Sequence, residues 1–275
     1  MFWQTTRYPI DLALPRVMGI VNLTPDSFSD GGQYAGTTAA LRHCEALIAQ
    51  GAHILDIGAE STRPGATPLP LDDELARLLP VLTEAVKLGV PISVDTYKPR
   101  VMQAALDLGA DIVNDIWALR QRGAAEVVLQ HPQCGVVLMH MHRDPQTMQT
   151  LPMEGDVVPQ VLLFLQQTTH HLCRAGLEKS RIVVDSGIGF GKTVAQNFAL
   201  LARQQELLAA GAPLLAGWSR KSSLGAVTGL EVGDRLLPSV AAALLAVERG
   251  ARIVRVHDVA ETVQALQVWQ AARAL

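Results

Sequence analysis

Eight short apolar runs recur along the chain, separated by longer segments of helical pattern. The runs are nearly continuous in apolar residues rather than alternating, which is typical of strands in a parallel sheet covered by helices. They occupy residues 17–22, 53–58, 91–96, 111–116, 135–141, 181–186, 213–219 and 252–258. The clearest helical segments between them are residues 37–50, 71–88, 157–175 and 239–250.

A second repeat marks where helices end. Four Gly-Ala pairs stand just before a predicted strand, where glycine supplies the left-handed conformation that ends a helix; they begin at Gly51, Gly109, Gly211 and Gly250. Eight units in 275 residues average about 34 residues each, as expected for a (β/α)8 barrel. A doubly wound sheet also alternates, but rarely needs eight units without a break in composition. We therefore predict one TIM barrel over residues 17–275, with residues 1–16 as an N-terminal extension that could cover the barrel bottom.

Composition excludes several classes of protein. Apolar residues make up 49% and charged residues 18%, which argues against disorder. The net charge of −3 gives no reason to expect nucleic acid or a membrane as a partner. Three widely spaced cysteines without a Cys-x-x-Cys pair predict reduced thiols. Residues 1–16 lack the pattern of a signal peptide, and the longest apolar run, 240–247, is too short to span a membrane. We expect a soluble, cytoplasmic protein.

Nearly every predicted strand ends in polar residues. Functional groups of a parallel barrel sit at the carboxyl ends of its strands, and buried unpaired carboxylates are costly, so packing alone does not explain this pattern. Arg255 and His257 flank Val256, which places both on one face of their strand. The polar strand ends are Asn22, Asp56, Asp95, Asn114, His140, Asp185, the run Ser219-Arg220-Lys221, Arg255 and His257.

These side chains indicate the class of ligand. Carboxylates and amides suit a flat heterocycle with several donors and acceptors, whereas basic groups suit phosphate. The basic groups expected to converge at the barrel top are Arg63, Arg220, Lys221, Arg255 and His257. The pattern therefore predicts a barrel enzyme that binds a polar ring and a phosphorylated group.

A series of motifs resembles one family. In chain order they read MGIVNLTPDSFSDGG, DIGAESTRPGA, SVDTYKP, NDI, LMHM, DSGIGFGK, SRKS and RVHD. From Val17 to its end, the chain resembles bacterial dihydropteroate synthase. The resemblance implies condensation of 6-hydroxymethyl-7,8-dihydropterin pyrophosphate with p-aminobenzoate, which releases pyrophosphate and gives 7,8-dihydropteroate for folate biosynthesis. It also implies Mg²⁺ as cofactor, a homodimer, and sulfonamides as competitive inhibitors.

The resemblance assigns roles position by position. Catalysis falls to Lys221, Asp95, Arg255 and His257. The pterin pocket comprises Asp95, Asn114, Asp185, Lys221, Ile116, Met139, Phe190 and Gly217. Asn22 matches the magnesium-binding asparagine and, with Thr62, Arg63, Arg255 and His257, contacts pyrophosphate. The p-aminobenzoate positions are Thr62, Pro64, Phe190, Ser219 and Phe28. Residues 24–32 match a movable loop over the substrate, while the apolar helix around 236–247 is a reasonable dimer contact.

These roles agree with elementary chemistry. A carboxylate such as Asp185 accepts two hydrogen bonds from the adjacent N–H donors of an aminopyrimidine edge, and Asn114 can read a mixed edge. The aryl amine is neutral at pH 7, so no strong base must precede attack. The barrier lies in breaking the C–O bond to pyrophosphate, which arginine, histidine and magnesium lower by holding the departing charge. We expect pyrophosphate to leave before much bonding to the amine.

Several alternatives stand beside this interpretation. The segment GIGFGKT (187–193) suggests a phosphate-binding P-loop, but the first glycine of that motif is replaced by Ser186. His140 and His142 could bind a metal, although a third ligand is not evident. Asp115 must face away from Asn114, and Asp56 either contacts the ligand or supports a residue that does.

Departures from the family pattern put pocket shape and loop stiffness in question. They are Ala59, Tyr97, Trp117, Ser186 and Ile188. A pterin-binding methyltransferase barrel would share the strand-end carboxylates but has no need of SRKS or RVHD to hold pyrophosphate. A non-catalytic paralogue that only binds pterin would keep the same residues.

Overall fold

Eight parallel strands form a closed barrel in the computed structural model, which describes residues 1–23, 32–61, 65–148 and 150–273. The strands follow one another around the barrel in chain order, from β3 to β10, and β10 pairs with β3 to close it. The predicted (β/α)8 fold is confirmed. The barrel strands are β3 (Arg16–Asn22), β4 (Ile54–Gly58), β5 (Ile92–Asp95), β6 (Ile112–Asp115), β7 (Gly135–Met139), β8 (Ile182–Asp185), β9 (Leu214–Ala216) and β10 (Ala251–Val256).

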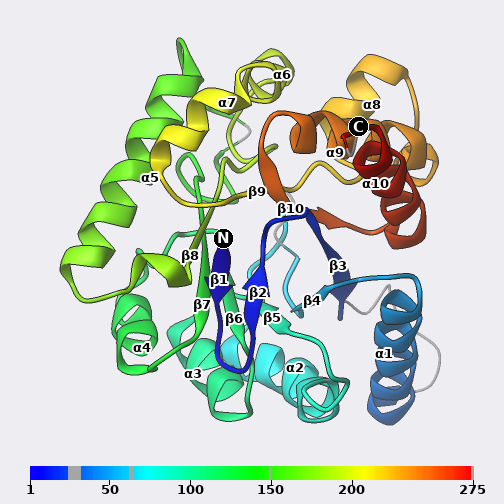
Figure 1. Ribbon diagram of the computed structural model, residues 1–275. Coiled ribbons are helices and arrows are strands. Elements are labelled where there is room, and N and C mark those ends of the chain that lie inside the picture. The colour runs from blue at the N-terminus through cyan, green and yellow to red at the C-terminus, as the bar shows by residue number, and fades with distance from the viewer. Residues whose placement is uncertain (24–31, 62–64, 149, 274–275) are drawn as a thin grey trace.

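Helices surround this barrel (Figure 1). They are α1 (Gly32–Ala49), α2 (Leu71–Ala85), α3 (Pro99–Asp107), α4 (Ala124–Gln130), α5 (Val157–Arg174), α6 (Val194–Ala202), α7 (Gln204–Leu207), α8 (Ser222–Thr228), α9 (Leu236–Glu248) and α10 (Val259–Arg273). Short 3₁₀ turns occur at Lys179–Arg181, Leu208–Ala210 and Val232–Asp234. The glycines of the four Gly-Ala pairs have positive φ angles between 75° and 99°, as their position at helix ends predicts.

The predicted strands extend further at their carboxyl ends than the observed ones. β9 ends at Ala216 and β7 at Met139, whereas the sequence predicted strands to 219 and 141. His140 and Ser219 are therefore presented from loops rather than from the strands themselves. Arg220 even adopts a positive φ of 57°, which a side chain other than glycine rarely does.

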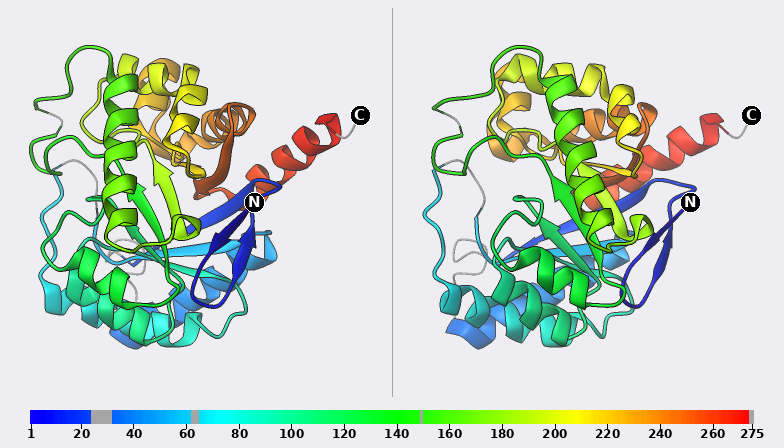
Figure 2. Two further views of the ribbon diagram at one scale, coloured as in Figure 1. Left: turned by 60° about the vertical axis from the view of Figure 1, so that its left-hand side comes forward. Right: turned by 90° about the vertical axis from the view of Figure 1, so that its left-hand side faces the viewer.

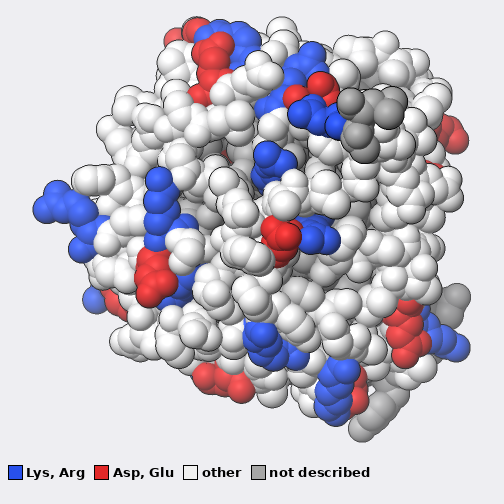
Figure 3. All heavy atoms as spheres, viewed as in Figure 1, with Lys and Arg blue, Asp and Glu red and all other residues white. Residues whose placement is uncertain are grey.

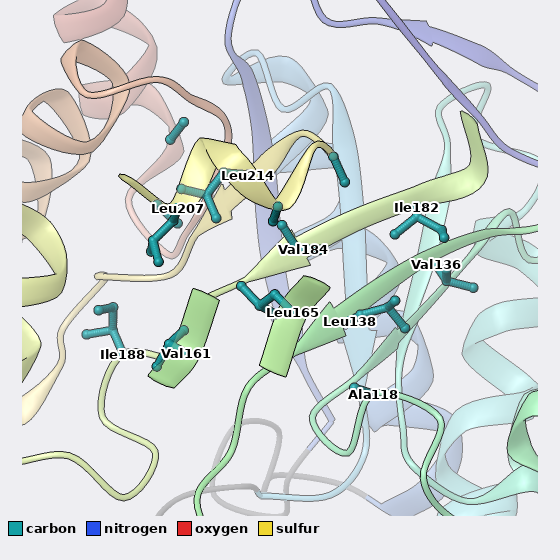
Figure 4. Packing of buried hydrophobic residues seen from close by; sticks show 14 of the residues in the cluster. Ala118, Val136, Leu138, Val161, Leu165, Ile182, Val184, Ile188, Leu207 and Leu214 are labelled. Atoms are coloured by element: carbon teal, nitrogen blue, oxygen red, sulfur yellow. The ribbon is translucent and has the colours of Figure 1, made fainter. Parts of the chain in front are cut away.

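The largest apolar core lies between the outer face of the barrel and its helices (Figure 4). Leu138 of β7 and Val184 of β8 are fully buried with Val161 and Leu165 of α5. Burial of each such side chain contributes about 1.5–3 kcal/mol. This layer holds the strands in register and so fixes where their carboxyl ends lie.

A hairpin closes the opposite end of the barrel. It consists of β1 (Phe2–Gln4) and β2 (Pro9–Asp11), and it lies at the end opposite the long β7–α5 loop (Figure 2). Trp3 is fully buried among inward-facing residues such as Met18 and Ile112, and its Nε1 donates to the carbonyl of Arg181 at 2.9 Å. The barrel bottom is therefore sealed, which leaves the carboxyl ends of the strands for a site.

The charged surface gives no sign of a large single-sign patch on the bottom face. Basic and acidic side chains are interspersed there (Figure 3). Among the described helices, none has the length and apolar character needed to cross a membrane.

Candidate active site at the barrel top

The strand register brings the predicted polar residues together. Asp95 pairs in register with Asn114, Met139 pairs with Asp185, and Asp56 lies beside Ile20. Because parallel strands in a barrel alternate their side chains inward and outward, these residues share the interior near the carboxyl ends. Side chains from strands far apart in the chain thus surround one space.

Arg255 lies at the centre of this group. Its Nε donates to Asp56 Oδ2 at 2.5 Å and its Nη2 donates to Asp95 Oδ2 at 2.7 Å. Although burial disfavours the charged guanidinium, the two carboxylates raise the pKa of Arg255 above its ordinary value. A permanently charged guanidinium is thereby fixed where a phosphorylated group can meet it.

Asp95 is the carboxylate most affected by this environment. Burial raises its pKa to about 7, with the Arg255 charge opposing the rise and the Asp56 charge adding to it. At neutral pH the Asp95 carboxyl can therefore accept or donate a hydrogen bond.

Asp56 accepts hydrogen bonds from two neighbouring residues of the site, Arg255 and Asn114. It is fully buried, and the oxygen that binds Arg255 also accepts from Asn114 Nδ2 at 3.1 Å. This bond orients the Asn114 amide so that its carbonyl oxygen is left for a ligand. The geometry assigns Asp56 to the positioning of Arg255 and Asn114. Its Oδ1 and the buried Ser93 Oγ have no hydrogen-bond partner in the described part of the chain.

Asp185 stands on the other side of the space. Its Oδ1 accepts from the backbone N–H of Gly187 at 2.7 Å. Burial raises its pKa, while the Gly187 bond and the charges of Lys221 and Lys192 oppose that rise. A Cβ atom added at Gly217 would lie 3.8 Å from Asp185 Oδ2, so Gly217 borders the carboxylate.

An apolar wall adjoins these carboxylates. Ile116, Met139 and Phe190 belong to one buried cluster, together with Met141 and Met148. The Lys221 ammonium lies 4.5 Å from the centre of the Phe190 ring, a cation–π arrangement. The predicted ring-binding residues are therefore brought together on two sides of one space.

The loop between β8 and α6 depends on its glycines. A Cβ atom at Gly187 would lie 1.9 Å from the carbonyl oxygen of His140, and both Gly187 and Gly191 have positive φ angles. Buried Lys192 joins this loop to the end of β7, because its Nζ donates to the carbonyls of His140, Gly187 and Phe190. Burial lowers the pKa of Lys192 to about 7.

Lys192 is a residue that sequence reasoning missed, although it lies in the GIGFGKT segment. Its amine binds carbonyls of its own loop, whereas a P-loop lysine must reach phosphates. The P-loop alternative is therefore wrong, and the segment is a glycine turn held by the Lys192 amine.

Ser219 and His257 connect the last two strand ends. Ser219 Oγ lies 2.9 Å from His257 Nδ1 and accepts from the backbone N–H of His257 at 3.1 Å. Burial and the charges of Arg255 and Arg220 lower the pKa of His257 to about 3. This lowered pKa favours the neutral imidazole at pH 7. Because Ser219 Oγ already accepts from the backbone N–H, its own O–H can donate to Nδ1, and the proton of the neutral imidazole is then on Nε2.

Arg220 differs from the prediction that it converges on the phosphate. Its Nη2 and Nε donate to the two carboxylate oxygens of Asp258, at 2.5 Å and 3.2 Å. The ion pair ties the SRKS segment to the end of RVHD and occupies the guanidinium. Arg220 therefore holds the two cationic loops together.

Two further polar residues at strand ends, Asp115 and His140, contact the protein itself. Asp115 accepts from the backbone N–H groups of Trp117 and Leu119 at 2.8 and 2.7 Å, so it orients a loop as expected. His140 is buried against Phe164, with ring centres 4.9 Å apart, and burial lowers its pKa to about 2. His140 thus packs in the core rather than facing an open metal site.

Asn22 is the last residue of β3 and is half-buried beside Gly58. No group of three or more His, Cys, Asp and Glu side chains in the described residues could hold a metal ion. Mg²⁺ keeps several waters and binds substrate phosphate oxygens beside few protein oxygens, so the Asn22 amide oxygen is a suitable kind of protein ligand for it.

Four predicted site residues lie outside the described residues: Phe28, Thr62, Arg63 and Pro64. The predicted movable loop over 24–32 lies outside them as well, except for Gly32, which begins α1. A cavity of about 160 Å³ adjoins the site and shares Ile116 with it. Tyr97 and Trp117, two departures from the family pattern, line this cavity.

Comparisons with known proteins agree with the motifs. The family model for pterin binding enzymes matches residues 18–257. The dihydropteroate synthase of Neisseria meningitidis serogroup B is 49% identical over 275 residues, covering 98% of this chain and 96% of the relative. The chain belongs to the dihydropteroate synthase family. The predicted family and its transferase class are confirmed.

Solved structures of the dihydropteroate synthase family show the same fold. The Xanthomonas albilineans enzyme with 4-aminobenzoic acid has a TM-score of 0.94 at 48% identity, with both chains fully covered. The Burkholderia cenocepacia enzyme complexed with 7,8-dihydropteroate has a TM-score of 0.90 at 49% identity, covering 99% of this chain and 96% of the other. The Yersinia pestis enzyme in a sulfonamide drug complex has a TM-score of 0.94 at 40% identity, with both chains fully covered.

Proposed function

We propose that this protein condenses 6-hydroxymethyl-7,8-dihydropterin pyrophosphate with p-aminobenzoate to give 7,8-dihydropteroate and pyrophosphate. The observation that carries the proposal is the fixed Arg255 guanidinium, bound by Asp56 and Asp95, beside the carboxylate and amide groups of Asp185 and Asn114. A donor-rich ring and a departing anion need these two kinds of group side by side.

The carboxylate and amide groups of the site bind the pterin ring. Asp185 accepts from adjacent N–H groups of the pterin, and the Asn114 carbonyl, oriented by Asp56, accepts from another. Asp95 faces the same ring and stabilises positive charge that develops on it. Ile116, Met139 and Phe190 pack against its faces, and Gly217 leaves room beside Asp185.

The cationic side receives the leaving group. Arg255 and Lys221 carry charge toward pyrophosphate, and His257 donates a hydrogen bond from its neutral ring. Residues Thr62 and Arg63 belong to the same proposed pyrophosphate site. Pyrophosphate leaves before much bonding to the amine forms, so cleavage of the C–O bond should depend weakly on the basicity of the amine. A steep dependence on that basicity would contradict this step.

Mg²⁺ is the proposed cofactor, held by Asn22 together with pyrophosphate oxygens and water. When bound, it neutralises charge on the departing pyrophosphate. The p-aminobenzoate positions are Phe28, Thr62, Pro64, Phe190 and Ser219. Sulfonamides would compete with p-aminobenzoate there, and the Yersinia pestis relative in a sulfonamide complex supports this proposal.

The proposal extends to a cytoplasmic homodimer. The thiols of Cys44, Cys134 and Cys173 are free, as a reducing compartment favours. Leu237 and Leu245 of α9 are 74% and 45% exposed, which supports α9 as part of a contact between two copies. Sedimentation at several concentrations tests the dimer, and a persistent monomer would contradict it.

One assay tests the activity. Purified protein is incubated with Mg²⁺, pterin pyrophosphate and p-aminobenzoate, and pyrophosphate release is measured against formation of 7,8-dihydropteroate. Equal amounts of both products are expected. No release from folded protein would contradict the proposal and favour a binding-only paralogue or a methyltransferase-type barrel.

Lys221→Ala provides the matched test of the site. Turnover should disappear, because the Lys221 ammonium faces Phe190 in the proposed site. The fold should remain, because Lys221 is only half-buried at the start of α8. Circular dichroism and thermal unfolding check the fold. Near-normal turnover would show that the site is misplaced.

A further inference from the structure

A buried charge network lies beside the proposed active site and joins the β4–α2 and β5–α3 connections to the first turn of α2. The Lys98 ammonium donates to the carboxylates of both Glu60 and Glu74. These side chains are 16%, 9% and 1% exposed, respectively. Burial of three charged groups is costly unless each is paired, so loss of any one partner should destabilise the fold.

Two hydroxyl groups complete the network. Tyr97 donates its O–H to Glu60 Oε1 at 2.8 Å, and Thr96 donates to Glu74 Oε1 at 2.7 Å. The backbone N–H of Lys98 donates to Thr96 Oγ1 at 3.2 Å. All four carboxylate oxygens of Glu60 and Glu74 therefore have a donor, and a fully satisfied buried network is rigid.

The network joins two segments that carry proposed site residues. Thr96 directly follows Asp95, which binds Arg255. Glu60 follows Gly58 by two positions, and a Cβ atom added at Gly58 would lie 3.2 Å from Cβ of Asp95. Glu60 also precedes Thr62 by two positions in the sequence. The Glu60 carboxylate thus fixes the described chain two positions before the proposed p-aminobenzoate residue Thr62.

We propose that Glu60, Tyr97 and Lys98 form a positioning network for the amine half of the reaction. By fixing Glu60, just after β4, relative to the segment that follows Asp95, the network sets the distance between the aryl amine and the pterin methylene carbon. A misplacement of about 1 Å can lower a rate about 100-fold, which explains why such a connection is held by buried charges. This inference rests on the proposed function.

A purely structural role is the competing explanation, and substrate-specific kinetics separate the two. Tyr97→Phe removes a single hydrogen bond and keeps the ring, so it is the principal variant. Glu60→Gln removes the charge at nearly constant shape. Lys87→Met is the matched control, because the Lys87–Glu84 ion pair has side chains 62% and 51% exposed and lies away from the network.

The expected result is a selective change. Tyr97→Phe should raise the KM for p-aminobenzoate roughly 3- to 10-fold and lower kcat by a similar factor, because the amine is held less well in reaction geometry. The KM for pterin pyrophosphate should stay within about 2-fold of wild type. Glu60→Gln should change the first two values more strongly. Lys87→Met should leave all three values unchanged. In a double-mutant cycle, Glu60→Gln should add little to Lys98→Met, since both changes break the same pair.

Two outcomes would overturn the inference. Folded Tyr97→Phe and Glu60→Gln variants with an unchanged KM for p-aminobenzoate, or with both KM values raised equally, would assign the network to stability alone. An inactive wild-type protein would overturn the proposed function and this inference with it. An active wild type with unselective variants would overturn only the inference.

Discussion

The barrel holds a buried aspartate–arginine pair at each end, and the two differ in how completely the carboxylates are used. At the bottom, Asp111 accepts four hydrogen bonds, from Arg7 N, Nε and Nη2 and from the backbone N–H of Ile92. At the top, Asp56 and Asp95 share Arg255, and Asp56 Oδ1 has no partner in the described part of the chain.

The difference separates a structural pair from a functional one. The saturated Asp111 carboxylate fixes the N-terminal hairpin region to the barrel and has nothing left to offer a ligand. The pair at the top keeps unused acceptor capacity and an Asp95 carboxyl whose pKa is about 7. A buried ion pair thus indicates a site when its hydrogen bonding is incomplete.

The largest expected effect is on catalysis at the top pair. Arg255→Met should lower kcat/KM about 100- to 1,000-fold, because it removes a fixed cation that faces the departing charge. Steady-state kinetics with both substrates measure this change. A loss smaller than about 5-fold would show that the guanidinium only balances Asp56 and Asp95.

The bottom pair should respond in stability instead. Arg7→Met should lower the free energy of unfolding by about 2 kcal/mol, below the range of about 3–5 kcal/mol for a broken fully buried pair. The smaller value is expected because Arg7 is 31% exposed and the backbone donors to Asp111 remain. Tm should fall by about 4–8 °C while kcat stays within about 2-fold. A large loss of kcat in folded protein would remove the distinction between the two ends.

Asp95 should make the top pair sensitive to pH. Its pKa in the folded protein is about 7, above the ordinary value of 3.8, so the folded state binds the proton more tightly. Its contribution to stability is therefore fully present below about pH 4 and is lost as pH rises through about 7. Urea unfolding of ligand-free wild type and Asp95→Asn should show their difference in free energy changing in that direction. A difference that is constant across this range would contradict the shifted pKa.

The smallest effect concerns the unpaired hydroxyl next to Asp56. Ser93 pairs in register with Asp56 and is fully buried, with no partner for its Oγ among the described residues. Ser93→Ala removes this unsatisfied group, so the free energy of unfolding should stay the same or rise by about 1 kcal/mol. A clear loss of stability would indicate that Ser93 has a hydrogen-bond partner in solution, such as a buried water.

The sequence predicted the barrel and its polar strand ends because both follow from local patterns. Apolar runs, Gly-Ala pairs and terminal carboxylates are read within a few residues of one another. The pairing of these groups could not be read in this way. Asp56 and Arg255 are 199 residues apart and meet only when the barrel closes. The same closure buries His257 beside Arg255, which lowers the pKa of the imidazole, and brings Arg220 to Asp258.

The contacts of Lys192 could not be predicted from the local sequence either. It stands in a segment whose letters suggest phosphate binding, yet its direction depends on the positive φ angles of Gly187 and Gly191 and on the nearby end of β7. Tertiary contact decides whether that amine faces a ligand or the backbone.

The contact between Trp3 and Arg181 also has a consequence for biosynthesis. The two residues are 178 positions apart, so the ribosome, adding about 5–20 residues per second, needs roughly 10 s or more between them. Throughout that interval the Trp3 indole has no barrel bottom to enter. The hairpin must therefore dock late, and during synthesis its apolar face is exposed to chaperones and to other nascent chains.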